Sequence, residues 1–206
     1  MMMISIIIPC HDTASYISKC LNSIIQQENN LNIQREIIVV CDSCSDNSQQ
    51  IATEILSKQN SWSYKIISVN EKSPGGARNK GYELAIGKYI WFVDSDDWIP
   101  KINTIDTLIN IMEKENLNLI NFKIQSNADP NGNYGSLAST VWQSIETQEL
   151  IGDTVFNDRQ NGEDNDWAYE IWHKSDIHYK QIDFIGYFYN FPRRGSQSDL
   201  KHHFFK

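Results

Sequence analysis

Residues 89–98 read YIWFVDSDDW, an apolar run that passes directly into Asp94, Asp96 and Asp97. The run predicts a strand, and the carboxyl end of a strand is where a parallel sheet presents its ligands. The segment therefore predicts an α/β fold with an acidic site at one edge of its sheet.

The chain around this segment alternates between strand and helix patterns. Strands are expected at residues 4–9, 36–40, 64–69, 89–93 and 117–125, and helices at residues 16–25, 51–56, 74–86 and 105–112. Strands that alternate with helices of this length pair in parallel through right-handed crossovers. We expect a Rossmann-like, mostly parallel central sheet flanked by helices. Asp46 or Ser45 is placed to cap the second helix, and Gly87 to end the third.

Composition limits the domain organisation and the partners. The chain has 206 residues, of which 40% are hydrophobic, enough for one core, so we expect a single domain over residues 1–206. The net charge of -8, with scattered Lys and Arg, argues against nucleic acid as a partner. No targeting or membrane-spanning segment is evident, and the four cysteines do not form a secreted disulfide framework, so we expect a cytoplasmic protein.

The three aspartates after the fourth expected strand indicate a metal. Crowded carboxylates repel one another, whereas a hard divalent cation that bridges to diphosphate oxygens would stabilise them. Asp94 and Asp96 alternate along an extended segment and face the same way, while Asp97 is placed to cap the following turn. The alternative interpretation is an acidic loop with a helix cap.

Two further segments predict parts of a pocket. Asp42 follows a buried run, and His11 and Asp12 end the neighbouring first strand, so these side chains should converge on a pocket floor where Asp42 accepts a hydrogen bond from a base or ribose. Residues 73–81, SPGGARNKG, place glycines and Arg78 at a helix start, where Arg78 could pair with phosphate or hold Asp94 or Asp96. The alternative is a tight turn with a surface arginine.

Three segments carry a family resemblance, in this order along the chain: PCHDTASYI, VVCDSCSDNS and SPGGARNKGYELAIGKYIWFVDSDDW. With them the chain resembles the nucleotide-binding half of the family 2 glycosyltransferases with the GT-A fold. The resemblance covers roughly residues 1–100 and leaves residues 101–206 as the acceptor-side half. It implies that Pro9, Asp12 and Asp42 line the base, that Arg78 and Asn79 support the donor, and that Asp94 contacts the ribose or the metal. It also implies that Asp96, with Asp94, binds Mn²⁺ or Mg²⁺. We expect His11, Gly76 and Ser95 to complete the donor site.

The match to the family departs at two points. Cys41-Asp42 stands where the family usually has paired acids, and His11-Asp12 where it usually has Tyr-Asn. The contacts to the base are therefore open, with a UDP-sugar favoured as donor.

The resemblance also implies a catalytic base in an acidic pair, for which Glu163 and Asp164 stand at a fitting distance along the chain. Asp164 shares a helical stripe with Trp167 and Ile171, so it should face the core or a cleft, as suits a general base. An acidic first turn that complements the helix dipole explains Glu163 at least as well. Arg193 or Arg194 is expected to hold the leaving diphosphate.

The expected reaction is inverting transfer of a sugar from a nucleotide diphosphate to a glycan or other acceptor hydroxyl, by one displacement. Two alternatives are a degenerate protein that only binds nucleotide sugars, and a zinc-stabilised binding module in which Cys10, His11, Cys41 and Cys44 form a Cys3His set. A nucleotidyltransferase is disfavoured, because no basic glycine-rich loop follows the first strand. The sequence leaves open the donor sugar, the acceptor, the oligomeric state and peripheral membrane contact.

Overall fold

The computed structural model describes residues 3–134, 140–143, 155–157, 163–172 and 177–191. The strands are β1 (Met3–Cys10), β2 (Gln34–Asp42), β3 (Ser63–Val69), β4 (Tyr89–Phe92), β5 (Leu119–Ser126), β6 (Asn133–Tyr134), β7 (Thr140–Gln143) and β8 (Tyr179–Tyr189). The helices are α1 (Ile17–Ile25), α2 (Ser48–Leu56), α3 (Pro74–Leu84), α4 (Thr104–Glu115) and α6 (Glu163–Trp172).

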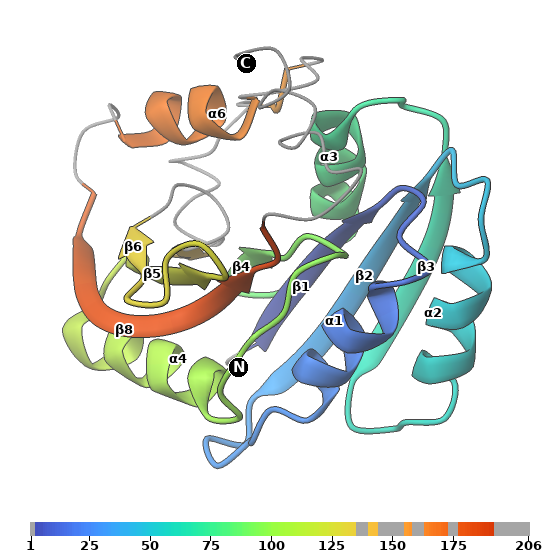
Figure 1. The fold of residues 1–206 in the computed structure, drawn as a ribbon. Coiled ribbons are helices and arrows are strands. Elements are labelled where there is room, and N and C mark those ends of the chain that lie inside the picture. Colours follow the sequence, from blue (N-terminus) through green and yellow to red (C-terminus); the bar gives the residue numbers. More distant parts are fainter. Residues whose placement is uncertain (1–2, 135–139, 144–154, 158–162, 173–176, 192–206) are drawn as a thin grey trace.

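All eight described strands form a single sheet in the order β3-β2-β1-β4-β7-β5-β6, with β8 paired to β5 (Figure 1). The pairs β3-β2, β2-β1 and β1-β4 are parallel, which confirms the prediction of a parallel first half. Beyond β4 the sheet is mixed, because β7 runs antiparallel to both β4 and β5, whereas β8 runs parallel to β5. The carboxyl ends of β1, β2 and β4 thus lie at the same edge.

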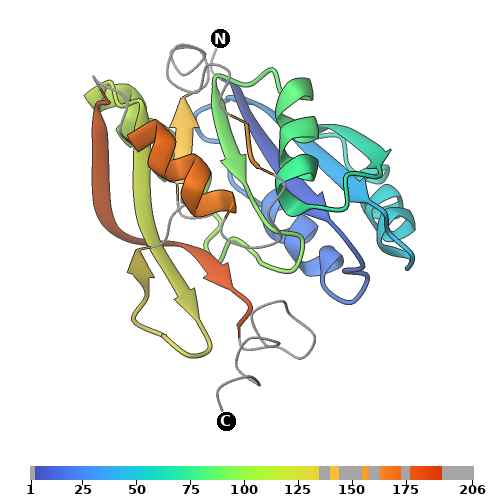
Figure 2. The same ribbon diagram turned by 90° about the horizontal axis from the view of Figure 1, so that it is seen from above.

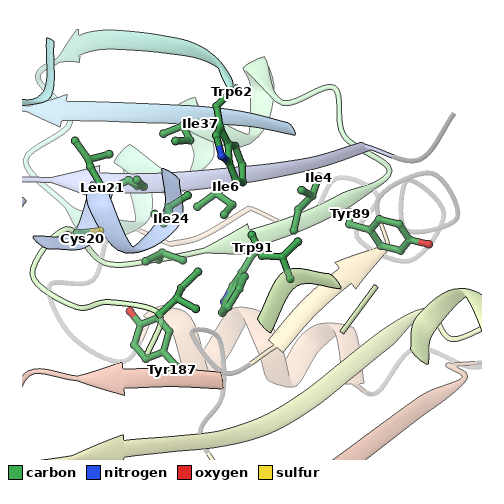
Figure 3. Close-up of a cluster of buried hydrophobic side chains, with 14 of the residues drawn as sticks. Ile4, Ile6, Cys20, Leu21, Ile24, Ile37, Trp62, Tyr89, Trp91 and Tyr187 are labelled. Atoms are coloured by element: carbon green, nitrogen blue, oxygen red, sulfur yellow. The ribbon is translucent and has the colours of Figure 1, made fainter. Parts of the chain in front are cut away.

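The sheet carries apolar side chains on both faces. One cluster packs Ile4, Ile6 and Trp91 of the sheet against α1, α2 and α4 (Figure 3). A second cluster packs Ile7, Phe92 and their neighbours against α3 and α6. Figures 1 and 2 show α1 and α2 on one side of the sheet and α3 on the other. These strands therefore read as continuous apolar runs because both of their faces are covered.

Two expected helix ends differ from the structure. Asn47, and not Asp46 or Ser45, occupies the N-cap position of α2, although Asp46 Oδ1 still accepts a hydrogen bond from the Ser48 backbone N–H at 2.9 Å. Helix α3 ends at Leu84, because Ala85 already has an extended backbone, so Gly87 does not end it. Gly87 is instead needed for close approach, since a Cβ there would lie 2.5 Å from Ser5 Oγ.

None of the helices in the described part of the chain has the length and hydropathy needed to cross a membrane.

Helix α3 lies against β1 and β2 through Gly81. A Cβ at Gly81 would lie 2.3 Å from Ile7 Cγ2 and 3.2 Å from Val40 Cγ2. Both neighbours are β-branched and buried, so neither can rotate away without disturbing the core.

We therefore expect Gly81→Ala to lower the free energy of unfolding by about 1–2 kcal/mol, because overpacking exceeds the gain in helix propensity. In thermal unfolding this is a fall of roughly 2–8 °C in Tm. Glu83→Ala, at an exposed position of α3, is the matched control and should leave the Tm nearly unchanged. An unchanged or higher Tm for Gly81→Ala would show that α3 does not sit this close to β1.

Candidate active site

A buried ion bridge joins the end of β4 to the start of α6. Arg78, on α3, donates from Nη2 to Asp94 Oδ1 at 2.9 Å and from Nη1 to Glu163 Oε1 at 2.5 Å. Its side chain is 8% exposed, that of Glu163 is 6% exposed and that of Asp94 is 36% exposed. Three segments distant in sequence thus meet at a single guanidinium.

The charges in this bridge depend on each other. Burial lowers the pKa of Arg78, but Asp94 and Glu163 more than offset that effect, so the pKa lies above its ordinary value. Arg78 is therefore a permanent cation between the two carboxylates. Of the partners considered for Arg78 from sequence, the structure pairs it with Asp94.

Asp97 joins the acidic segment after β4 to β8 and to the residue that follows it. It is 1% exposed and accepts hydrogen bonds from the Tyr187 hydroxyl at 2.8 Å and from the Asn190 backbone N–H at 2.9 Å. The Tyr187 hydroxyl accepts in turn from the Asp94 backbone N–H at 3.0 Å. Burial, and next the charge of Asp94, raise the pKa of Asp97 to about 8. Asp97 therefore fixes the acidic segment to β8 and does not cap the following turn.

The ends of β1 and β2 meet as the sequence predicted. His11 Nδ1 lies 2.7 Å from the Asp42 carbonyl oxygen. Asp12 is exposed, has a φ of 48°, and accepts hydrogen bonds from the backbone N–H of Ser45 at 2.6 Å and of Asp46 at 3.1 Å. The hydrogen bonds from Ser45 lower the pKa of Asp12 and keep it ionised.

The carboxylate of Asp42 holds the turn that leads into α3. It is 5% exposed and accepts from the backbone N–H groups of Glu71, Lys72 and Ser73 at 2.9, 3.1 and 3.0 Å. Ser73 then caps α3 by accepting from the Gly76 N–H at 3.1 Å. Asp42 is thus bound mainly to the backbone amides of a turn, whereas the sequence favoured a contact to a base or ribose over a turn role for it.

Asn79 binds the backbone of a segment outside the helix that carries it. Its Nδ2 donates to the Phe156 carbonyl oxygen and its Oδ1 accepts from the Phe156 N–H, both at 2.9 Å. Phe156 stacks on Trp167 with ring centroids 4.6 Å apart. Asn79 therefore helps to hold the residues that support α6.

The remaining expected site residues lie at the same edge or at α6. Ser95 is buried and accepts from Thr13 Oγ1 at 3.0 Å, and Pro9, near the end of β1, is half-buried. Asp96 and Asp164 are both half-buried, whereas Glu163 is buried. Asp164 is thus half-buried, as the helical stripe predicted, and Glu163 lies deeper because it pairs with Arg78. Arg193 and Arg194 lie outside the described residues.

The donors at the end of β4 fit a hard divalent ion. Asp94 and Asp96 offer carboxylate oxygens that are not fully buried, the ligand type that Mg²⁺ and Mn²⁺ take together with substrate phosphates. Within the described ranges, no carboxylate belongs to a group of three or more metal-type donors lying within 4.8 Å of one another. An ion at this place would therefore need oxygens from a ligand as well as from the protein.

Three thiols form a different group of metal-type donors. The Sγ atoms of Cys10, Cys41 and Cys44 lie within 4.8 Å of one another, as the zinc alternative required. His11 is not part of this group, because its ring is turned toward the Asp42 carbonyl and its side chain is 65% exposed. The proposed Cys3His set is thus reduced to three thiols.

A sheet with a parallel first half that gathers acidic and polar groups at the carboxyl edge of that half is typical of a GT-A type fold. The family model described as Glycosyl transferase family 2 matches residues 5–173, and the chain belongs to that family. GlyG of Streptococcus pneumoniae serotype 4, a glycosyltransferase, is 30% identical over 170 residues, which are 81% of this chain and 52% of GlyG. The chain spans about half the length of such curated relatives, or less.

Solved structures share the fold. TarS of Staphylococcus aureus, in complex with UDP-GlcNAc, superposes with a TM-score of 0.81 at 20% identity, over 97% of this chain and 61% of that one. The mannosyltransferase PcManGT of Pyrobaculum calidifontis, in complex with GDP-Man and Mn²⁺, gives a TM-score of 0.74 at 13% identity, over 93% and 58%. At these identities the likeness shows the fold alone.

Removing the charge of Arg78 should show how much the ion bridge contributes to the free energy of unfolding. Arg78→Met leaves Glu163 buried without its cation, and we expect the free energy of unfolding to fall by about 3–5 kcal/mol. Glu163→Gln in the Arg78→Met background should recover part of that loss, because the unpaired charge is then gone. Chemical denaturation of both single variants and the double variant measures the coupling.

The matched control for Arg78→Met is Lys80→Met, which breaks the surface pair with Glu83 and should cost less than about 1 kcal/mol. If the losses of the Arg78 and Glu163 variants simply add, the two side chains are not coupled and the bridge is not present in solution.

Proposed function

We propose that this chain catalyses inverting transfer of a sugar from a nucleotide diphosphate to the hydroxyl of a glycan or another acceptor. The observation that carries the proposal is the bridge from Arg78 to Asp94 and Glu163. It places an acidic helix start beside the acidic strand end, so a donor and a proton acceptor could occupy the same site. Family membership supports glycosyl transfer as the reaction.

The donor is assigned to the edge formed by β1, β2 and β4. We propose that Pro9, His11 and Asp12 line the base and ribose, and that Asp42 shapes this wall through the turn that it binds. Gly76, Arg78, Asn79, Asp94 and Ser95 complete the donor side. TarS, with UDP and UDP-GlcNAc, is a structural neighbour and supports a UDP-sugar as the donor.

The diphosphate is assigned to the end of β4. Arg78 engages Asp94 Oδ1 and partly neutralises that carboxylate, which leaves Asp96 as the main ligand for Mn²⁺ or Mg²⁺, with Asp94 as the second. The ion, when bound, would stabilise the negative charge of the departing nucleotide diphosphate. The Mn²⁺ in PcManGT supports this choice of ion.

Asp164 is the proposed general base, and Glu163 its positioning partner. Glu163 is committed to Arg78 and buried, so it fixes the first turn of α6. Asp164 is the next residue and is half-buried, and it could take the proton from the acceptor hydroxyl as that oxygen attacks the anomeric carbon. A single displacement of this kind inverts the anomeric configuration. Residues 1–100 thus serve the donor and residues 101–206 the acceptor, within one domain.

We assign the chain to the reducing cytoplasm, because its four cysteines do not have the pattern of a secreted disulfide framework.

Calorimetric titration with UDP and with GDP, each with and without Mn²⁺, tests the donor site. We expect UDP to bind at least tenfold more tightly with Mn²⁺, and Asp96→Asn to abolish that gain. Asp183→Asn is the matched control, because Asp183 is 82% exposed and pairs with Lys123 on β5. Equal binding of UDP by Asp96→Asn with Mn²⁺ would remove Asp96 from the metal site.

Release of UDP from UDP-GlcNAc, with water as the acceptor, tests the base. Asp164→Asn should lower kcat by about 10²–10⁴-fold, because the attacking oxygen keeps its proton, while the Kd for UDP stays within about twofold. Glu170→Gln, at an exposed position of the same helix, is the control. A wild-type chain that binds UDP and Mn²⁺ but releases no UDP from any nucleotide sugar would instead be the degenerate binding protein.

A further inference from the structure

Three thiols gather beside the proposed donor site without a role in it. Cys10 ends β1, and Cys41 is its Cα partner on β2, so the two side chains stand next to each other across a parallel pair. Cys44 follows in the loop after β2, and its thiol donates to the Cys10 carbonyl oxygen at 3.3 Å. The three Sγ atoms lie within 4.8 Å of one another, and all three cysteines are free.

Two of these thiols are buried, and one of them also makes a polar contact. Cys10 is 2% exposed and Cys41 is 1% exposed, as expected of small hydrophobic residues, but the Cys10 sulfur also lies 3.2 Å from Thr13 Oγ1. Cysteine binds metals as the thiolate, and three sulfurs this close together offer one ion three ligands of the same kind.

The spacing of the sulfurs fits a thiophilic ion. Zinc–sulfur bonds of about 2.3 Å put the sulfurs of a tetrahedral site about 3.8 Å apart, and those of a trigonal site about 4.0 Å apart. Separations of up to 4.8 Å need only a small closure of the three side chains. A disulfide would use two of the sulfurs and leave the third, whereas a metal ion uses all three.

We propose that Cys10, Cys41 and Cys44 bind one thiophilic metal ion, Zn²⁺, as three thiolates. Each cysteine that is still protonated releases its proton to the buffer as its sulfur–zinc bond forms, and no oxidation or reduction takes place. Cys44 is the partly exposed member, so the ion enters on its side and takes water as the fourth ligand there.

Such an ion would reinforce the loop that holds Asp12. Cys44 directly precedes Ser45, whose backbone N–H and hydroxyl donate to Asp12 at 2.6 and 2.8 Å. A metal ion would join this loop, through Cys44, to the end of β1, through Cys10. Asp12 follows Cys10 in the chain and is hydrogen-bonded to the same loop, so the ion would fix both of its attachments. Binding of the ion does not depend on the proposed glycosyl transfer, so the two proposals can fail separately.

Titration of the full chain with Cd²⁺, after treatment with a chelator and a phosphine reductant, tests the proposal through the ultraviolet thiolate-to-cadmium absorption band. We expect one Cd²⁺ per chain, competition by Zn²⁺, and a rise in Tm with either ion. Cys44→Ser should weaken binding at least tenfold. Cys20→Ala is the matched control, because Cys20 is buried outside the cluster, and it should bind as the wild type does.

Alkylation of the wild-type chain with and without Zn²⁺, mapped by mass spectrometry, decides the matter even if Cys44→Ser does not fold. Zn²⁺ should protect Cys44 and, on slower labelling, Cys10 and Cys41, without changing the labelling of Cys20. Absence of the band in the folded wild type, equal affinity of Cys44→Ser, or no protection by Zn²⁺ would overturn the proposal.

Discussion

The buried guanidinium of Arg78 is the contact on which the candidate site depends. It is the cation that joins Asp94 at the end of β4 to Glu163 at the start of α6, and Arg78 itself lies 85 residues from Glu163 along the chain. Taking an arginine and a glutamate out of water is costly, and only their mutual attraction and close geometry repay it. That cost means that α3, β4 and α6 can take up this arrangement only together. The sheet therefore supplies the scaffold, and the ion bridge sets the position of α6 on it.

Around the bridge, the side chains divide into a deeper set that holds the site and a more exposed set that borders it. Asp42, Asp97 and Asn79 have carboxylate or amide atoms hydrogen-bonded to backbone amides or carbonyls, and each fixes a segment that borders the site. Asp12, Asp94, Asp96 and Asp164 are the more exposed acids. A rigid inner layer and a more accessible outer layer are what preorganisation of a charged substrate requires.

Local sequence rules were sufficient for the first half of the fold. The apolar runs of β1, β2 and β4 and the helical stripe of α1 depend on neighbours in sequence, and their boundaries fall within a few residues of the expected ones. The convergence of His11 and Asp42 also followed, because parallel neighbours end at the same edge. The mixed half of the sheet did not follow, since the place of β7 between β4 and β5 depends on long-range pairing.

The site was less predictable than the sheet for the same reason. The stripe Asp164, Trp167, Ile171 was enough to predict that Asp164 is not fully exposed, but the burial of Glu163 depends on Arg78, which lies on another helix. Asp97 is hydrogen-bonded to Tyr187 and Asn190, which lie some 90 residues further along the chain. No local sequence pattern connects them to Asp97. The thiol cluster could be predicted in part from the sequence, because neighbouring parallel strands place Cys10 beside Cys41.

The most direct test of this account is a crystal structure of the chain with UDP and Mn²⁺, with anomalous scattering used to locate the manganese. The account predicts a single strong manganese peak in contact with the Asp96 carboxylate and the diphosphate, beside Asp94, with Arg78 still joined to Asp94 and Glu163. A manganese peak away from Asp96, or UDP bound elsewhere than the carboxyl ends of β1, β2 and β4, would contradict it.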